Sequence, residues 1–245
     1  MGNIWSFFAF PLNLIIALLW SAVLLMLWAN RRDSSVVRFL LSPSATISAI
    51  SLLGIGCLWI GISGDRSFVT SVVFLAVLLY VQTVLFLIIL RGYRRPDGVI
   101  RWRFLLIHVG LLVAVGSGFW GAPDSYELRV RLSKGESTHE AYMLDGGRTT
   151  LSYELLLTDF NSRYGTDGMP EHYEATVTVN EGEPVRIMVN HPYNVRFGED
   201  IYLANVTESG CVLQIVHEPW RYFVLLGIIM LIAGAFMLFI GGPKR

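Results

Sequence analysis

Five long apolar stretches constrain this chain of 245 residues more than any other feature of its sequence. None of them contains Asp, Glu, Lys or Arg, and a helix that crosses a bilayer needs about 20 mainly apolar residues. The first stretch is interpreted as a helix and not as a signal peptide, because no basic residue precedes it and its apolar run is too long. The sequence therefore predicts five membrane helices, at Ile4–Trp28, Ala45–Ser63, Phe68–Leu90, Phe104–Trp120 and Tyr222–Ile240.

The composition excludes several classes of protein. Hydrophobic residues make up 53% of the chain and charged residues 16%, against about 25% charged in an ordinary soluble domain. These values exclude a disordered chain, a basic nucleic-acid-binding domain and a disulfide-rich secreted scaffold. The net charge of zero conceals a division, because residues 122–218 hold 16 acidic and 7 basic side chains. An acidic insert of net charge −9 therefore interrupts apolar helices that have basic flanks.

The basic residues predict the orientation in the membrane. The first loop carries Arg31, Arg32 and Arg38, the third carries five arginines, and the C-terminal tail carries Lys244 and Arg245. Basic loops stay in the cytoplasm. This pattern predicts a multi-pass membrane protein whose N-terminus and residues 122–218 lie outside and whose C-terminus lies inside.

The insert has the pattern of β-strands. In Tyr126–Leu132, apolar side chains alternate with charged ones, as in a strand with one buried face. Four further stretches are rich in β-branched or aromatic residues, and turn signals such as Asp145-Gly146-Gly147 separate the strands. About seven short strands are expected, in an antiparallel sandwich or open barrel. The predicted domains are membrane helices in 1–121, an extracytoplasmic β domain in 122–218, and a fifth helix with a cytoplasmic tail in 219–245.

Common catalytic and redox motifs are missing from the sequence. It has no Walker loop, GxSxG, HExxH, GxGxxG, CxxC or CxxCH. The two cysteines, Cys57 in the second span and Cys211 in the insert, are interpreted as unpaired structural residues. An enzyme with its own nucleophile and base is accordingly the least favoured class.

His108 is the most informative single residue. It is the only histidine in any predicted span, and it lies about 6 Å inside the fourth span from Phe104, in the cytoplasmic third. Ionisable groups in the membrane usually face the bundle interior and mark a site. An imidazole there can ligate a metal, relay a proton or hydrogen-bond a neighbouring helix, and the residues alone leave these alternatives open.

Several segments, in order, resemble the ResB family of System II cytochrome c biogenesis proteins. The family pattern covers about residues 36–240, and Ile4–Trp28 has no counterpart in its four helices. The segments are Arg38–Pro43 before the second span, Leu90–Arg95 after the third, Ile107–Leu112 around His108, Leu157–Phe160 with Asp167–Pro170, Val189–Pro192, and Glu218-Pro219.

The resemblance implies a function and a location. ResB proteins act with a CcsA/ResC-type partner, in the bacterial cytoplasmic membrane, as a haem-exporting cytochrome c synthase. The complex carries haem b to the outer face and attaches it to the cysteines of apocytochrome c. By this resemblance His108 is a haem axial ligand, the second ligand comes from the partner, and this chain is not catalytic alone. Arg101 and Arg103, just before His108, are either positive-inside anchors or partners for the haem carboxylates.

Two other functions remain as alternatives. One is a membrane scaffold or assembly factor whose β domain binds a partner, with His108 structural and no haem of its own. The other is a transporter for a different apolar ligand, although five spans without a visible inverted repeat disfavour it.

Overall fold

The computed structural model describes residues 7–64, 68–69, 71–164, 170–207 and 209–241. The chain forms two compact units: a membrane unit, residues 1–123 with 220–245, and a β unit, residues 124–219. The β unit is inserted in the sequence between the fourth and fifth long helices. The motif residues Asp167, Gly168 and Met169 and the basic tail residues Lys244 and Arg245 lie outside the described residues.

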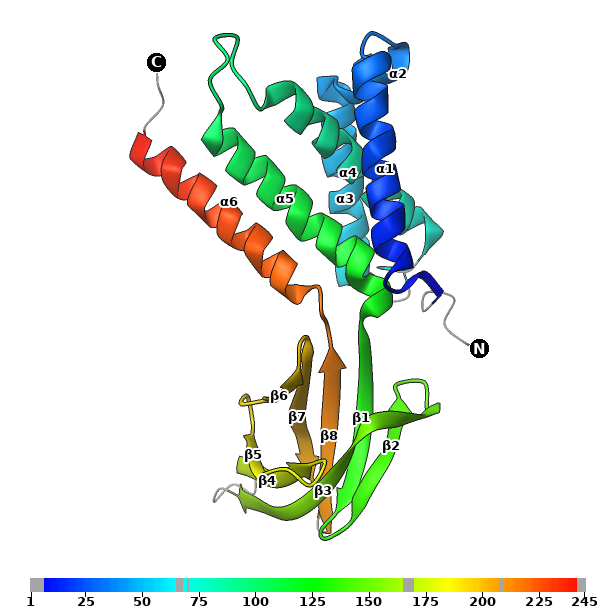
Figure 1. Ribbon diagram of the computed structural model, residues 1–245, viewed down its shortest axis with the longest axis vertical. Coiled ribbons are helices and arrows are strands. Elements are labelled where there is room, and N and C mark those ends of the chain that lie inside the picture. Colours follow the sequence, from blue (N-terminus) through cyan, green and yellow to red (C-terminus); the bar gives the residue numbers. More distant parts are fainter. Residues whose placement is uncertain (1–6, 65–67, 70, 165–169, 208, 242–245) are drawn as a thin grey trace. The chain divides into compact units, whose positions relative to one another are not determined.

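Five long helices build the membrane unit (Figure 1). Each is long and apolar enough to cross a membrane, which confirms the predicted multi-pass architecture. A short helix, α2 (Ser35–Leu40), which the sequence analysis did not predict, lies in the first loop, and a 3₁₀ turn, η3 (Ala122–Asp124), follows the fourth long helix. The long helices are α1 (Leu12–Asn30), α3 (Pro43–Ser63), α4 (Val72–Gly92), α5 (Trp102–Gly121) and α6 (Arg221–Gly241).

The largest difference from the prediction is at the start of α1. The helix was expected from Ile4 but begins at Leu12, immediately after Pro11. Proline cannot donate a helical hydrogen bond, and it disfavours the helical conformation in the residue before it, so the helix cannot extend back through Phe10. The expected start at Ile4 itself lies outside the described residues.

Serine side chains begin three of the helices. Ser34, Ser42 and Ser71 accept hydrogen bonds from backbone amides in the first turns of α2, α3 and α4. Such caps satisfy amides that have no partner inside the helix. The third span was expected from Phe68, and the Ser71 cap explains why α4 begins at Val72 instead.

Small residues let α5 and α6 pack closely within the membrane unit. A Cβ atom added at Gly110 would lie 2.8 Å from the Gly227 carbonyl oxygen, and one added at Gly227 would lie 2.7 Å from the Ala114 amide. Backbones approach this closely in membranes where both helices carry small residues. Gly118 continues the row of Gly110 and Ala114 in the sequence, but a Cβ atom there would meet nothing within 4 Å. Two of the three residues of the small-residue row therefore contact α6.

The β unit is a single antiparallel sheet of eight strands in the order β5-β4-β3-β2-β1-β8-β7-β6 (Figure 1). The first and last strands along the chain, β1 and β8, pair in the middle of the sheet over eight residue pairs. The strands are β1 (Tyr126–Ser133), β2 (Ser137–Met143), β3 (Arg148–Tyr164), β4 (Pro170–Val179), β5 (Val185–Met188), β6 (Tyr193–Arg196), β7 (Glu199–Val206) and β8 (Gly210–His217).

The sheet curls into an open barrel, one of the two predicted forms. Strands β4 and β5 from one end contact β7 near the other end, and no pairing joins β5 to β6 among the described residues. Inward side chains from most strands form one core, which includes Val130, Leu157, Val177, Ile201 and Leu213. Five helices and an antiparallel β domain between the fourth and the fifth confirm the predicted fold class.

Three strands had no specific prediction from the sequence. Strand β2 reads Ser-Thr-His-Glu-Ala-Tyr-Met. It is mostly polar, and only Ala141 is buried. Strand β3 is 17 residues long and pairs with β2 through one half and with β4 through the other. Strand β6 has only four residues. Polar, bent or very short strands lack the alternation on which a sequence prediction depends.

Candidate functional site

His108 is anchored to its own helix. Its Nδ1 atom lies 2.8 Å from the carbonyl oxygen of Phe104, one turn earlier in α5. A carbonyl oxygen only accepts, so Nδ1 carries the hydrogen and Nε2 of the neutral ring keeps its lone pair. A backbone hydrogen bond of this kind commonly fixes the tautomer of a metal-binding histidine. The side chain is half-buried, and the chemistry of its Nε2 atom fits an axial ligand of haem iron.

Aromatic stacking holds the ring of His108 in place. The Phe104 ring stacks on it with the two ring centroids 3.9 Å apart. The Arg101 guanidinium lies over the Phe104 ring, 4.9 Å from its centroid. Phe104 fits against α4 because residue 92 there is glycine, where a Cβ atom would lie 2.5 Å from the ring. Arg101 also donates to the Gly92 carbonyl oxygen at 3.4 Å. Arg101, Phe104 and His108 therefore form one stacked column at the start of α5, whereas Arg103 is not part of it.

A cavity of about 300 Å³ lies elsewhere in the membrane unit, among α1, α4, α5 and the first turn of α6. Most of its lining is apolar, and His108 does not line it. On its wall the Trp120 indole donates to the Gln82 side-chain oxygen at 3.0 Å. The Trp20 indole nitrogen is buried and has no hydrogen-bond partner among the described atoms. The structure thus does not bring the predicted histidine and the cavity together.

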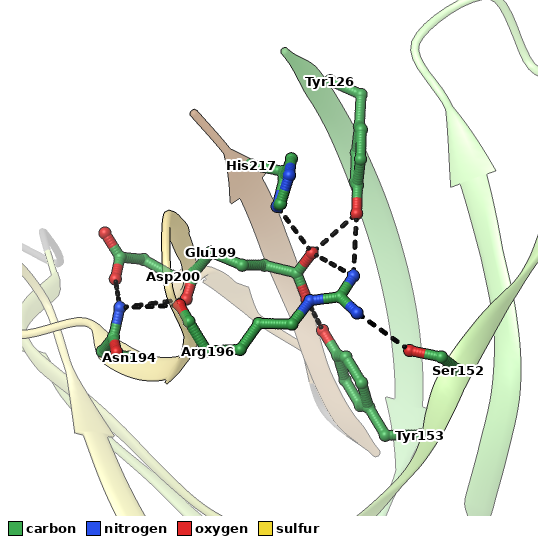
Figure 2. A network of polar contacts seen from close by, with 8 residues as sticks. All are labelled: Tyr126, Ser152, Tyr153, Asn194, Arg196, Glu199, Asp200 and His217. Atoms are coloured by element: carbon green, nitrogen blue, oxygen red, sulfur yellow. Dashed lines mark hydrogen bonds and ion pairs between the residues drawn. The ribbon is translucent and has the colours of Figure 1, made fainter. Parts of the chain in front are cut away.

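The β unit contains a buried carboxylate that the sequence analysis missed (Figure 2). The Glu199 side chain is 1% exposed. Its Oε2 atom accepts from the Tyr126 hydroxyl at 2.6 Å and from the Arg196 guanidinium at 2.8 Å, and its Oε1 atom accepts from the Tyr153 hydroxyl at 2.8 Å. The two-residue turn between β6 and β7 places Arg196 directly opposite Glu199. Three donors from three other strands therefore converge on one carboxylate.

The electrostatics of this cluster favour an ionised Glu199. Burial raises the pKa of Glu199, but hydrogen bonds from Tyr126, Arg196 and Tyr153 outweigh it and hold the pKa below its ordinary value. Burial, followed by the hydrogen bond to Glu199, raises the pKa of Tyr126 to about 12 and that of Tyr153 further. Both tyrosines are therefore neutral donors, and among the described residues Arg196 is the only opposite charge in direct contact with Glu199.

His217 completes the cluster from β8. Its ring stacks on Tyr126 with the centroids 4.6 Å apart. Its Nδ1 atom lies 3.1 Å from Glu199 Oε2, but the geometry is not that of a hydrogen bond, and the atom has no such partner among the described residues. Burial lowers the pKa of His217 more than the nearby Glu199 raises it. His217 is therefore neutral at pH 7, and the short distance does not represent an ion pair.

The Glu199 cluster is a clamp and not a reaction centre. Every donor in it points at a carboxylate that is closed to solvent, so a substrate cannot reach Glu199. The clamp joins β1, β3, β6 and β7 by hydrogen bonds, and His217 on β8 packs against it. The only sequence signal was an acidic pair, Glu199-Asp200, at the start of a strand, and such a pair is usually solvent-exposed.

Other candidate residues do not assemble into a site. Cys57 is exposed and Cys211 is buried, and both are free. Burial raises the pKa of the Cys211 thiol to about 12, so it is not a reactive thiolate. Among the residues that the structure describes, no group of three or more His, Cys, Asp and Glu side chains is placed to hold a metal ion.

One family model matches about half of the chain's length, in its central part. The family model described as ResB, the ResB-like family, matches residues 97–212. This segment is ResB-like. The match confirms the resemblance predicted from the motifs, and it includes α5 with His108 and nearly all of the β unit.

The sequence was also compared with curated proteins and the structure with solved structures. No curated protein matches the sequence. A solved structure titled "Cytochrome c Heme Lyase CcmF" is similar with a TM-score of 0.39 and 14% sequence identity, over 78% of this chain and 33% of that chain. The chain thus spans about a third of that protein's length.

Proposed function

We propose that this chain is a ResB-type subunit of a membrane complex that carries haem to the outer face and attaches it to apocytochrome c. The match of residues 97–212 to the ResB-like family supports a role in cytochrome c biogenesis. In this proposal the chain acts with haem-lyase components, specifically a CcsA/ResC-type membrane protein, and is not catalytic alone. The basic loops support an orientation with the N-terminus and the β unit outside the bacterial cytoplasmic membrane.

His108 is the residue proposed to contact haem. Bound haem supplies an iron atom that takes an imidazole nitrogen as an axial ligand. The observation that carries this role is the hydrogen bond of Nδ1 to Phe104, which leaves Nε2 with its lone pair while the Phe104 ring fixes the orientation of the imidazole. Arg101, one step further along the stacked column, has a guanidinium suited to a haem carboxylate.

The proposal is tested by replacing His108 with alanine in the chain co-expressed with a CcsA/ResC-type partner. Loss of the imidazole removes the ligand, whereas the Phe104 carbonyl keeps its ordinary helical hydrogen bond, so accumulation of the protein is expected to stay normal. Haem absorbance of the purified complex is expected to fall at least about tenfold, together with cytochrome c maturation. Added imidazole is expected to restore part of the haem spectrum.

A matched control is available in the β unit. His139 is exposed on β2, so His139→Ala removes a histidine without touching the proposed ligand. This variant is expected to keep its haem and its maturation activity. If the His108→Ala complex accumulates normally and keeps an unchanged haem spectrum, His108 is structural, and the scaffold or assembly factor becomes the better description.

A further inference from the structure

An arginine-lined cavity of about 880 Å³ lies on the outward face of the β unit. Arg129 and Arg131 on β1 and Arg148 on β3 line it, and none of the lining residues is Asp or Glu. The neighbouring residues Leu128, Val130 and Leu132 point to the opposite face, into the core. The three arginines are therefore presented to solvent by a rigid, well-packed sheet.

The strand register places the lining in two rows. Tyr142 on β2 lies between Arg148 on β3 and Arg129 on β1, opposite both of them. On its other side, Arg129 is opposite Gln214 on β8. The Arg148 guanidinium lies 5.9 Å from the centroid of the Tyr142 ring. Directly opposed residues of antiparallel strands share one face, so these side chains form a continuous row across four strands.

The second row lies two residues further along β1. Arg131 is opposite Val212 on β8, and Val212 is opposite Asn205 on β7. Two residues of a strand span about 7 Å, so Arg129 and Arg131 are spaced like alternate side chains of an extended peptide. The cavity therefore combines cations at a two-residue repeat with amides and apolar atoms.

The arginines of this cavity differ from the other basic residues whose side chains the structure describes in the β unit. Lys134 pairs with Asp159 at 2.6 Å, Arg196 pairs with Glu199 at 2.8 Å, and Arg186 pairs with Glu174. Arg129, Arg131 and Arg148 form no ion pair with any carboxylate that the structure describes. Among the basic side chains that the structure describes in this segment of net charge −9, those without an acidic partner are thus gathered around one cavity.

We propose that this cavity is a docking site for an acidic, extended segment of a partner protein, with carboxylates at alternate positions contacting Arg129 and Arg131. Guanidinium groups bind carboxylates through two parallel hydrogen bonds, which gives both strength and geometry. The exposed side chains of Met143 and Leu144 at the rim supply apolar contact for the same segment. This proposal is independent of haem binding by His108.

The test uses the full chain in nanodiscs of phosphatidylcholine, which carry no net charge. The probe is a fluorescein-labelled peptide of alternating Glu and Ser, and its matched control has Gln in place of Glu. Fluorescence anisotropy is expected to show binding of the Glu peptide and at least about tenfold weaker binding of the Gln peptide, because a neutral amide cannot form the charged, two-bond pair with a guanidinium group.

Variants locate the binding. R129Q combined with R131Q is expected to weaken binding of the Glu peptide at least about tenfold. Lys134→Gln, which removes one positive charge outside the cavity, is expected to change this affinity less than about twofold. Amide exchange of β1 and β8 checks that the double variant remains folded. A charge-reversed double variant, Arg129→Glu with Arg131→Glu, is expected to bind a Lys–Ser peptide instead.

Three results would overturn the proposal. The first is equal affinity for the Glu and Gln peptides, and the second is unchanged affinity in a folded R129Q and R131Q variant. The third is binding of phosphatidylglycerol vesicles through these arginines without binding of the peptide, which would make the cavity a lipid site.

Discussion

His108 in the membrane unit and Glu199 in the β unit are both polar side chains among apolar ones, but their partners lie at different distances along the chain. His108 is held by Phe104, four residues away in the same helix. Glu199 is held by Tyr153 and Tyr126, which are 46 and 73 residues away on other strands, as well as by Arg196 in its own hairpin.

The two arrangements leave different chemistry available. A single local hydrogen bond uses one ring nitrogen of His108 and leaves the other free to act as a ligand. The network around Glu199 uses both carboxylate oxygens and the side chain is closed to solvent, so the group stabilises the fold and is not accessible to a ligand. A polar residue among apolar ones is thus a better functional candidate when a local hydrogen bond leaves one of its atoms free than when a network of distant residues encloses it.

Removing the Glu199 carboxylate is the change with the largest expected effect on stability. Glu199→Ala leaves the buried Tyr153 hydroxyl without its acceptor and creates a small cavity, which we expect to cost about 2–4 kcal/mol of the free energy of unfolding of the β unit. Hydrogen exchange of the β1 and β8 amides in the full chain measures this loss locally. Glu183→Ala, at an exposed position of the same unit, is the control and is expected to change exchange very little. Unchanged exchange in Glu199→Ala would show that the clamp contributes no stability.

A smaller effect is expected from a methyl group between α5 and α6. Gly110→Ala places a Cβ atom against the backbone of Gly227, where neither helix can yield without separating, at an expected cost of about 1–3 kcal/mol. Gly118→Ala adds the same methyl group to the same helix in open space and is expected to be neutral or slightly stabilising. All seven tryptophans belong to the membrane unit, so thermal unfolding followed by tryptophan fluorescence reports on this comparison. Equal melting temperatures of the two variants would contradict the close packing.

The smallest expected effect is a dependence of the stability of the β unit on pH. Unfolded His217 takes up a proton as the pH falls through about 6.5, whereas burial keeps folded His217 neutral to lower pH. The unfolded state then binds more protons, so stability decreases as the pH falls. The contribution of Glu199, whose pKa is also lowered by folding, is lost only below about pH 4.5. Amide exchange at a series of pH values is expected to show the loss of stability that begins near pH 6.5 in the wild type and not in His217→Gln. If this loss persists in His217→Gln, a group other than His217 causes it.

The parts that could be predicted from the sequence are those that depend on nearby residues. The five membrane helices, the place of His108 inside the fourth, and the alternating strand at Tyr126–Leu132 all follow from hydrophobicity and period within a short window. The start of α1 was the exception, because the apolar composition before Pro11 outweighed the local effect of the proline in the prediction. The role of His108 in binding haem stays a prediction.

The sequence by itself therefore determined the division into apolar helices and an acidic β insert, because burial in a membrane and alternation in a strand are local properties. Only the tertiary structure decided that Glu199 meets Tyr126 and Tyr153, and that Arg129, Arg131 and Arg148 line one cavity. These contacts depend on strand order and register, and a shift of one residue would move every side chain of a strand to the other face. Register arises from the packing of the whole sheet, so no short stretch of sequence contains it.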